Sequence, residues 1–321
     1  MIAVNIPDAA ETQAAKKDSK LLPAGVWPVA VTPFHEDGAI DWKAYDRLID
    51  WYVENGSAGI YSVCLSSEFY HLTQAERLKL GEIAAKRCEG KIPVATSGGL
   101  GNNLKESVES VKAAADTGAA SVVIPLNQLV APSDSDEKLL QQLDLLLNLT
   151  GDIKLGIYEC PSPYRRGANP GIMRFCAMSG RFNFIKDTCC DVDEIGFKAA
   201  ACKDSNISIF NANINTLTHS MKVGSRGYNG VAANFYPDLL DALLKYRKTD
   251  PERAAMIEKV VLAGQRNATS KYLPNAKAFL SMSGVKMSTR CRTESPKLTK
   301  EDMECLEAFH FLIEYWRREL L

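Results

Sequence analysis

The chain has 321 residues, 46% of them hydrophobic, which is enough to bury a large core. Its 38 basic and 39 acidic residues are spread along the sequence and leave a net charge of −1, which argues against a nucleic-acid or anionic-membrane partner and favours a small molecule. No apolar run approaches the roughly 20 residues that span a bilayer, and the N-terminus lacks the pattern of a signal peptide. We therefore expect a cytoplasmic protein.

The nine cysteines lie within apolar segments and form no CxxC pair, which favours reduced, structural thiols over disulfides. Adjacent cysteines such as Cys189 and Cys190 are more typical of structural thiols than of nucleophiles. The four histidines are scattered and show no ligand spacing, so we expect no metal site and no cofactor.

The first 22 residues are polar and alanine-rich without an apolar face, and we expect them to form a flexible extension. From Gly25 onward, short β-branched runs alternate with longer amphipathic stretches, which is typical of parallel strands joined by helices. The expected strands are 26–32, 59–64, 93–96, 121–125, 154–158, 182–186, 208–211 and 227–231.

This alternation predicts a (β/α)8 TIM barrel over residues 23–247, because such a barrel needs about 200 to 250 residues. The alternative is an open doubly wound sheet, but the G-x-G-x-x-G turn that usually follows its first strand is absent. Residues 248–321 predict a C-terminal helical region that packs against the barrel or against a neighbouring subunit. Its expected helices are 252–267, 273–283 and 299–318.

Helix starts are marked by Asp41 and by Thr73, which forms a capping box with Glu76. Further helices are expected where apolar residues recur at helical spacing, at 103–117, 136–148 and 191–202.

The chemistry of a TIM barrel lies at the carboxyl ends of its strands, and the sixth expected strand ends in Lys186. Only the free amine of a lysine attacks a carbonyl, and burial at a barrel mouth favours that uncharged form. The alternative is that Lys186 pairs with a carboxylate or turns to solvent. The fifth strand ends in Tyr158, whose phenol could carry protons beside that amine, although a barrel tyrosine is more often a core residue.

The second strand ends in a polar turn whose Ser66 and Ser67 offer hydroxyls and backbone amides suited to a carboxylate. Such turns also occur as ordinary caps. The glycines of the 224–234 segment fit neither a dinucleotide-binding turn nor a Walker loop, and we interpret them as room for a ligand or a neighbouring strand.

Together these residues resemble the dihydrodipicolinate synthase and N-acetylneuraminate lyase family of pyruvate-linked class I aldolases, over about residues 25–280. The resemblance rests on the order and spacing of Val31-Thr32-Pro33-Phe34, residues 64–68 with Leu72-Thr73, residues 158–161, Ile185-Lys186-Asp187, and residues 224–234.

The resemblance implies that Lys186 forms a Schiff base with a 2-oxo acid such as pyruvate, and that Tyr158 donates and accepts protons. It implies that Ser66, with the amide of Ser67, holds the carboxylate, and that Asn229 lies beside the pyruvyl group. It also implies a homotetramer built as a dimer of dimers.

The chain departs from the family pattern in the strand-two turn, usually Gly-Thr-Thr-Gly-Glu or Gly-Ser-Thr-Gly-Glu. Cys64 and Ser67 replace its glycines, and Leu65 replaces a hydroxyl residue that belongs to the proton relay of the synthases. The strand-four loop, residues 125–128, lacks the tyrosine that one synthase subunit lends to its neighbour.

A further departure concerns the arginine that binds the aspartate-semialdehyde carboxylate in the synthases, which would fall near Pro163. Arg165 or Arg166 could replace it only if the loop is rearranged. Thr188 instead resembles the sialic acid lyase pattern.

The leading hypothesis is therefore a Schiff-base class I lyase that cleaves or dehydrates a 2-oxo-3-deoxy acid, with Lys186 and Tyr158 catalytic. Ser66, Ser67, Asn229, Thr188 and Arg166 are the candidate substrate-binding residues. The alternatives are a dihydrodipicolinate synthase-type condensation and a non-catalytic barrel that binds a 2-oxo acid.

Overall fold

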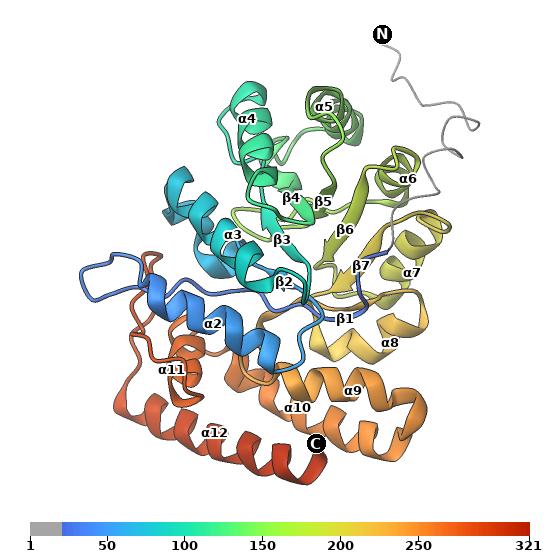
Figure 1. Ribbon diagram of the computed structural model, residues 1–321. Helices are drawn as coiled ribbons and strands as arrows, with labels where there is room; N and C mark the ends of the chain where they lie inside the picture. The colour runs from blue at the N-terminus through green and yellow to red at the C-terminus, as the bar shows by residue number, and fades with distance from the viewer. Residues whose placement is uncertain (1–20) are drawn as a thin grey trace. The chain divides into compact units, whose positions relative to one another are not determined.

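The structure, a computed structural model, describes residues 21–321, so the expected extension at 1–22 lies almost wholly outside the described residues. Its strands alternate with helices and form an eight-stranded sheet in the order β1-β8-β7-β6-β5-β4-β3-β2 (Figure 1), which confirms the predicted (β/α)8 barrel with C-terminal helices. The strands are β1 (Gly25–Val26), β2 (Ile60–Tyr61), β3 (Val94–Ser97), β4 (Ser121–Pro125), β5 (Leu155–Tyr158), β6 (Phe182–Asp187), β7 (Ser208–Asn211) and β8 (Gly227–Tyr228).

The described chain divides into two compact units, of which the first comprises residues 21–24 and 95–227. Its core is the parallel run β4-β5-β6-β7, in which Ile124 pairs with Ile157, Ile157 with Ile185, and Ile185 with Ile209. These isoleucines are at most 2% exposed, as expected for parallel strands covered by helices. The helices are α4 (Leu104–Ala115), α5 (Asp136–Leu149), α6 (Pro170–Met178), α7 (Val192–Ala201) and α8 (Leu217–Lys222), which lie on the outer side of these strands in Figure 1.

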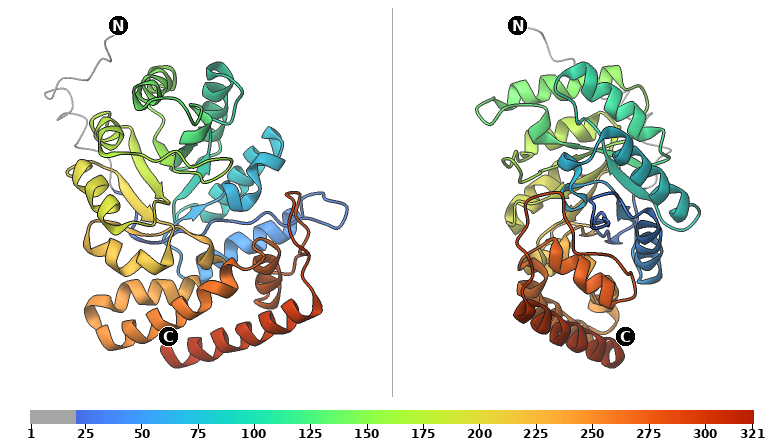
Figure 2. Two further views of the ribbon diagram at one scale, coloured as in Figure 1. Left: turned by 180° about the vertical axis from the view of Figure 1, so that it is seen from behind. Right: turned by 90° about the vertical axis from the view of Figure 1, so that its left-hand side faces the viewer.

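The second unit comprises residues 25–94 and 228–321. Here Val29, three residues after β1, forms an isolated parallel bridge with Tyr61 of β2, and β1 and β2 are the first and last strands of the sheet order. In both views of Figure 2 the last helix, α12, lies alongside α10 and α11. The helices are α2 (Trp42–Glu54), α3 (Gln74–Cys88), α9 (Pro237–Thr249), α10 (Pro251–Thr269), α11 (Pro274–Met282) and α12 (Lys300–Leu320).

The first, second and eighth strands are shorter than predicted from the sequence. The expected strand 26–32 contains only β1 and the bridge at Val29, because Pro28 has no N–H to give to a ladder. Val231, expected at the end of strand eight, begins a short 3-10 helix, η5 (Val231–Asn234).

The predicted helix starts are confirmed. The Asp41 carboxylate accepts the amide of Ala44 at 2.9 Å, and Thr73 and Glu76 form the reciprocal capping box ahead of α3. All three predicted C-terminal helices are present as α10, α11 and α12, with bounds that differ from the prediction by at most two residues.

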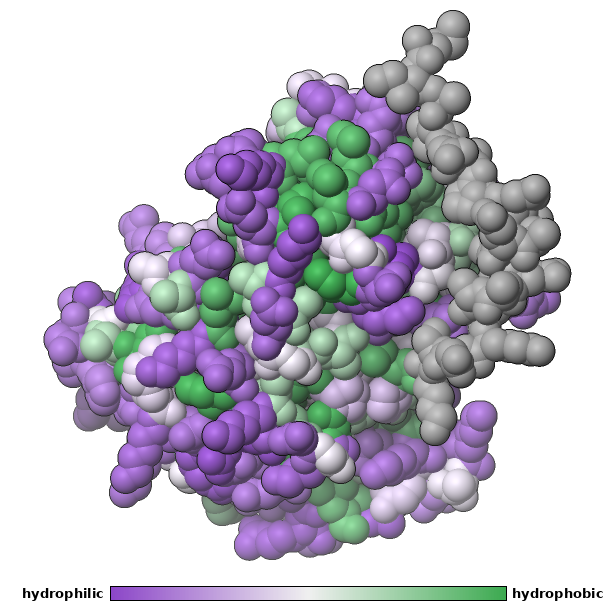
Figure 3. Space-filling view, turned by 45° about the horizontal axis from the view of Figure 1, so that its top comes forward, coloured by the Kyte–Doolittle hydropathy of each residue, from purple (hydrophilic) through white to green (hydrophobic). Residues whose placement is uncertain are grey.

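No helix within residues 21–321 is long and apolar enough to cross a membrane. Hydrophilic and apolar side chains are interspersed on the face drawn in Figure 3. All nine cysteines lie among the described residues, and each is a free thiol.

Gly59 occupies a position before β2 at which a side chain does not fit. A Cβ there would lie 2.5 Å from ring carbons of Trp27, which is fully buried. Gly196 in α7 is different, since a Cβ there would meet Val223 at an ordinary 3.4 Å.

We predict that Gly59→Ala destabilises the protein by about 1–3 kcal/mol, because the indole must move within a packed core. Gly196→Ala is the matched control and should stabilise by about 0.5–1 kcal/mol through its helix propensity. Urea unfolding of both variants measures the difference, and equal stabilities would contradict the packing argument.

Candidate active site

Lys186 and Tyr158 lie directly opposite each other on adjacent parallel strands. Tyr158 is the last residue of β5, and its Cα partner in the ladder is Lys186 of β6. The Lys186 Nζ lies 4.7 Å from the centroid of the Tyr158 ring. Both residues are buried, at 5% and 2% exposure, so the structure brings together an amine and a phenol away from bulk water.

The residue after each member of this pair is a buried carboxylate, and one lysine joins the two. Lys198 of α7 donates to Glu159 Oε1 and to Asp187 Oδ2, both at 2.6 Å, and all three side chains are fully buried. Glu194, one helical turn before Lys198, adds a third carboxylate at 2.8 Å from Nζ. The ends of β5 and β6 are therefore tied by a shared cation.

The charges in this cluster depend on one another. Burial lowers the pKa of Lys198, but Glu159 and Asp187 outweigh burial and raise that pKa above its ordinary value. Burial raises the pKa of Glu159, but Lys198, the Ala168 amide and Arg165 together outweigh burial and bring that pKa below its ordinary value. Burial, followed by the neighbouring Glu159, raises the pKa of Asp187. Removing the cation would leave two buried carboxylates facing each other.

Thr188 and Arg165 complete the cluster. The Thr188 hydroxyl donates to the Glu159 carbonyl at 2.6 Å and accepts from Arg165 Nε at 3.3 Å. Arg165 Nη2 also donates to Glu159 Oε2 at 2.8 Å. Arg166, the predicted substrate-binding arginine, instead pairs with Asp136 and donates to the Asp134 carbonyl at 2.9 Å. Of the two arginines, Arg165 is the one beside the end of β6.

We predict that Lys198→Met lowers stability by about 3–5 kcal/mol, because it removes one partner of a buried ion cluster. The loss should shrink as pH falls, since protonation of Glu159 and Asp187 relieves their repulsion. Lys245→Met is the matched control: Lys245 is 70% exposed in its pair with Asp241, so its replacement should change little. Urea unfolding at several pH values measures both, and an equal effect at all pH values would count against the charge argument.

In the second unit, the predicted carboxylate-binding turn is a 3-10 helix, η1 (Leu65–Ser67). The Ser67 amide donates to the Cys64 carbonyl at 3.1 Å, and the Ser67 hydroxyl donates to the same carbonyl at 2.7 Å. Thr32, in the segment that follows β1, stabilises the turn by donating to the Ser67 carbonyl at 2.7 Å. Ser67 is thus occupied within the turn.

Asn229 follows β8 and is fully buried. Its Nδ2 donates to the Trp27 carbonyl at 2.6 Å, which leaves the amide oxygen as an acceptor. That oxygen has no hydrogen-bond partner among residues 21–321. A buried acceptor without a partner is costly, and a ligand donor would satisfy it.

The residue after the Ser66-Ser67 turn, Glu68, is held by the segment that follows α11. Glu68 has a left-handed backbone with φ 63° and is 2% exposed. Its carboxylate accepts Lys277 Nζ at 2.9 Å and the amides of Arg292 and Thr293 at 2.6 and 2.7 Å. Arg292 in turn bonds both oxygens of Glu76 at 2.7 and 2.8 Å. The segment from Lys277 to Thr293 therefore holds the Ser66-Ser67 turn in place through Glu68.

We predict that Arg292→Gln destabilises the protein in a pH-dependent way. Hydrogen bonds from Arg292 lower the pKa of Glu76 to about 2 from an ordinary 4.5. A lowered folded-state pKa contributes stability above pH 4.5 that is lost as pH falls toward 2, so the deficit of the variant should shrink over that interval. Thermal unfolding between pH 2 and pH 7 measures it.

Arg47→Gln serves as control for this experiment, because Arg47 and Glu54 form a surface pair that is 45% and 55% exposed. Its stability should match that of the parent chain across the range. A deficit of Arg292→Gln that is constant with pH would contradict the role given to Glu76.

Two residues of the buried ion cluster, Lys198 and Glu159, were not among the site residues predicted from the sequence. The spacing of Lys198 could have predicted its burial, because it lies three residues after Ile195 on the buried face of α7. A buried lysine needs a charged partner. Glu159 follows directly after a predicted strand end, which is also where polar side chains are informative.

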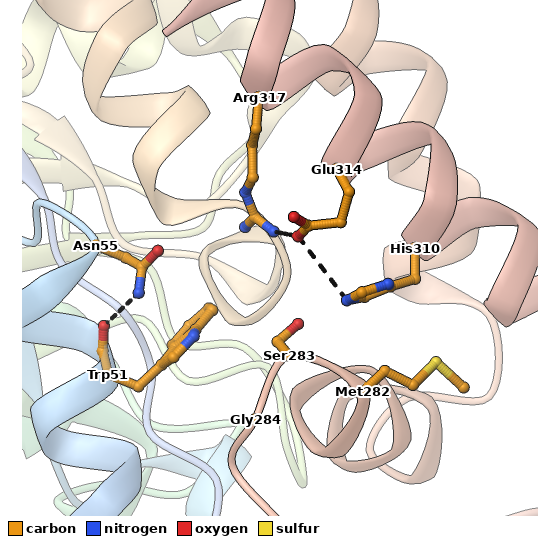
Figure 4. Close-up of a pocket in the computed structure, with 8 residues that line it drawn as sticks. All are labelled: Trp51, Asn55, Met282, Ser283, Gly284, His310, Glu314 and Arg317. Atoms are coloured by element: carbon orange, nitrogen blue, oxygen red, sulfur yellow. Dashed lines mark hydrogen bonds and ion pairs between the residues drawn. The ribbon is translucent and has the colours of Figure 1, made fainter.

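A separate hollow of about 470 Å³ lies in the second unit between α2, α11 and α12 (Figure 4). Its charges already have partners, since Arg317 pairs with Glu314 and donates to Asp238 at 2.7 Å. None of the predicted site residues lines it. Within residues 21–321 no group of three or more His, Cys, Asp or Glu side chains could hold a metal ion.

Comparison with known proteins gives concordant results. The sequence model of the Dihydrodipicolinate synthetase family matches residues 22–310. The 4-hydroxy-tetrahydrodipicolinate synthase of Oceanobacillus iheyensis is 26% identical over 285 residues, which cover 87% of this chain and 93% of the relative. The probable 2-dehydro-3-deoxy-D-pentonate aldolase YjhH of Escherichia coli K12 is 26% identical over 246 residues, which cover 74% of this chain and 79% of the relative.

A solved structure shares the fold. The crystal structure of YagE from E. coli K12, a prophage protein of the dihydrodipicolinic acid synthase family in complex with pyruvate, matches with a TM-score of 0.78. The match covers 91% of this chain and 98% of YagE at 20% identity.

Proposed function

The chain belongs to the dihydrodipicolinate synthetase family, and we propose that it is a Schiff-base-forming class I lyase that cleaves a 2-oxo-3-deoxy acid to pyruvate and an aldehyde. The named relatives include both a synthase and a probable aldolase, so the family relationship supports an enzyme and leaves the reaction to be argued from the residues.

The observation that carries the proposal is the Lys186–Tyr158 pair. A buried amine, 4.7 Å from the ring of a phenol on the next strand, is what imine chemistry with proton transfer requires. The ion cluster of Lys198, Glu159 and Asp187 supports it, since it fixes the two strand ends from which these side chains project.

The proposed reaction uses the imine as an electron sink. The Lys186 amine adds to the C2 carbonyl of the substrate and water leaves, which gives a protonated imine. Tyr158 accepts the proton of the C4 hydroxyl, the C3–C4 bond breaks, and its electron pair moves to C3 as the nitrogen is neutralised to an enamine. Tyr158 can accept the C4 proton because it has first given its own proton to the carbinolamine hydroxyl, which leaves as water, and so acts as a tyrosinate. The aldehyde departs, C3 takes up a proton from Tyr158, and water hydrolyses the imine to pyruvate and the Lys186 amine, whose released proton returns to Tyr158. A dehydratase would use the same imine to expel a hydroxyl.

We propose that substrate binding is divided among three residues. Ser66 donates to the substrate carboxylate, since Ser67 is engaged within its turn. The Asn229 amide oxygen accepts a hydrogen bond from the ligand or from a water bound with it. Arg165, rather than Arg166, is the arginine available beside Thr188.

Two alternatives remain to be distinguished. A dihydrodipicolinate synthase-type condensation is disfavoured because the strand-four loop lacks the lent tyrosine. Asn127 of that loop instead uses its amide to hold the carbonyls of Cys160, Ser162 and Tyr164 at 2.8–3.1 Å. A non-catalytic 2-oxo acid-binding barrel is disfavoured by the presence of both Lys186 and Tyr158.

We also propose a cytoplasmic homotetramer arranged as a dimer of dimers. Exposed apolar side chains of α12, which a neighbouring subunit could cover, support an oligomer. Phe311, Leu312 and Tyr315 expose 65%, 51% and 42% of their surface.

We predict that borohydride in the presence of pyruvate adds a pyruvyl mass to the native chain and not to Lys186→Ala, because only an imine at this amine is reducible to a stable adduct. Intact-mass spectrometry measures the adduct. Tyr158→Phe should still be trapped but should lose about 10²–10⁴-fold in turnover of a cleavable sugar acid, since it lacks the proton carrier.

Lys245→Ala, which removes an exposed lysine, controls for non-specific trapping. Absence of an adduct on the folded native chain would make the binding barrel the leading interpretation. An adduct without cleavage of any 2-oxo-3-deoxy acid, but with condensation onto an aldehyde acceptor, would favour the synthase.

A further inference from the structure

Lys277 of α11 is a fully buried lysine whose ammonium contacts the end of the Ser66-Ser67 turn. Its Nζ donates to Glu68 Oε1 at 2.9 Å and to the Arg290 carbonyl at 2.5 Å. The same Nζ lies 4.7 Å from the centroid of the Phe34 ring. Lysines are almost never fully buried without an anionic partner, and Glu68 is that partner.

Glu68 carries a buried negative charge beside the predicted carboxylate-binding turn. It follows Ser66 by two residues, so their Cα atoms lie within about 7 Å of each other. Its side chain is fully buried and accepts the amides of Arg292 and Thr293 at 2.6 and 2.7 Å, besides the Lys277 ammonium. Backbone amides have no net charge, so they leave the charge of the carboxylate to be balanced by the lysine.

A second cation nearby, the guanidinium of Arg292, has its own partner. It lies 4.8 Å from the Phe34 ring and donates to the two oxygens of Glu76 at 2.7 and 2.8 Å. The Arg292 and Glu76 side chains are 24% and 21% exposed, whereas both members of the Lys277–Glu68 pair are fully buried. Water screens the first pair and not the second, so the charge of Glu68 depends on Lys277.

We infer that Lys277 is a positioning residue for the substrate carboxylate, because it neutralises Glu68 beside the Ser66-Ser67 turn and so allows an anion to bind there. Without the ammonium, the negative charges of Glu68 and of the 2-oxo acid would oppose each other within one turn of chain. Like charges about 7 Å apart, at an effective dielectric constant of about 20, weaken binding by roughly 50-fold.

This inference rests on the proposed function and adds a residue that lies outside the strand ends and has no proposed contact with substrate. All of its residues belong to the second unit. It goes beyond holding the turn in place, because a charge effect depends on the charge of the ligand and a purely mechanical effect does not.

The test uses two ligands of the same shape and different charge. Pyruvate carries a carboxylate, whereas pyruvamide carries a neutral amide at that position, and both have the 2-oxo group that would form an imine with Lys186. Borohydride trapping followed by intact-mass spectrometry gives a trapping efficiency for each ligand. The efficiency for pyruvate divided by that for pyruvamide is the carboxylate preference, and a general loss of reactivity at Lys186 leaves this ratio unchanged.

Lys277→Met should lower the carboxylate preference at least about 10-fold, because the charge of Glu68 then opposes the ligand carboxylate. Glu68→Gln should raise the preference above that of the parent, since the Lys277 charge is then unbalanced and attracts an anion. The double variant should return to within about threefold of the parent, because neither charge is present. A merely structural role predicts instead that Glu68→Gln lowers the preference, because the turn is loosened.

Lys271→Met is the matched control, because Lys271 also pairs with a carboxylate in the same unit, that of Asp302. It should keep the preference of the parent. Circular dichroism establishes that each variant is folded. If Lys277→Met does not fold, the comparison of Glu68→Gln with the double variant still decides, since the single variant should show the higher preference.

An unchanged preference in Lys277→Met, or a lowered one in Glu68→Gln, would overturn the inference and leave the imine chemistry standing. Absence of trapping of both ligands by the native chain would overturn the proposed function and the inference together.

Discussion

A single buried ammonium, that of Lys198, ties together the two strand ends from which the proposed chemistry projects. It lies 2.6 Å from one carboxylate after β5 and 2.6 Å from another after β6. Because both carboxylates are fully buried, they coexist as charges only while the cation stays between them. The backbone positions of Tyr158 and Lys186, one residue before each carboxylate, are fixed with them. A residue without a proposed contact to substrate thus fixes the backbone positions of the two residues that we propose act on it.

The second unit also contains a buried carboxylate that is held by a lysine. Glu68 holds a left-handed backbone after the Ser66-Ser67 turn, and Lys277 with two backbone amides satisfies its carboxylate. The C-terminal segment that follows the barrel therefore holds this turn in place through Glu68.

Two departures from the family pattern lie in the turn after the second strand and in the loop after the fourth. Leu65 leaves the strand-two turn without one hydroxyl of the family pattern, so Ser66 and Ser67 are the hydroxyls that remain there. Asn127, in the strand-four loop that lacks the lent tyrosine, holds the loop that carries Arg165. The family fold is retained while these loops depart from the family pattern, which supports the proposal of a lyase whose substrate differs from that of the synthases.

The sequence by itself determined the alternation of strands and helices, the caps at Asp41 and Thr73, and the neighbouring strand ends of Tyr158 and Lys186. These follow from local periodicity and from the rule that consecutive βα units pair side by side. Only the tertiary structure decided that Lys198 pairs with Glu159, 39 residues away, and Lys277 with Glu68, 209 residues away. It also decided that Arg165, and not Arg166, lies at the end of β6. A local pattern specifies which face of an element is buried. The partner of a buried charge depends on how distant elements pack, and the sequence of a single segment does not determine that packing.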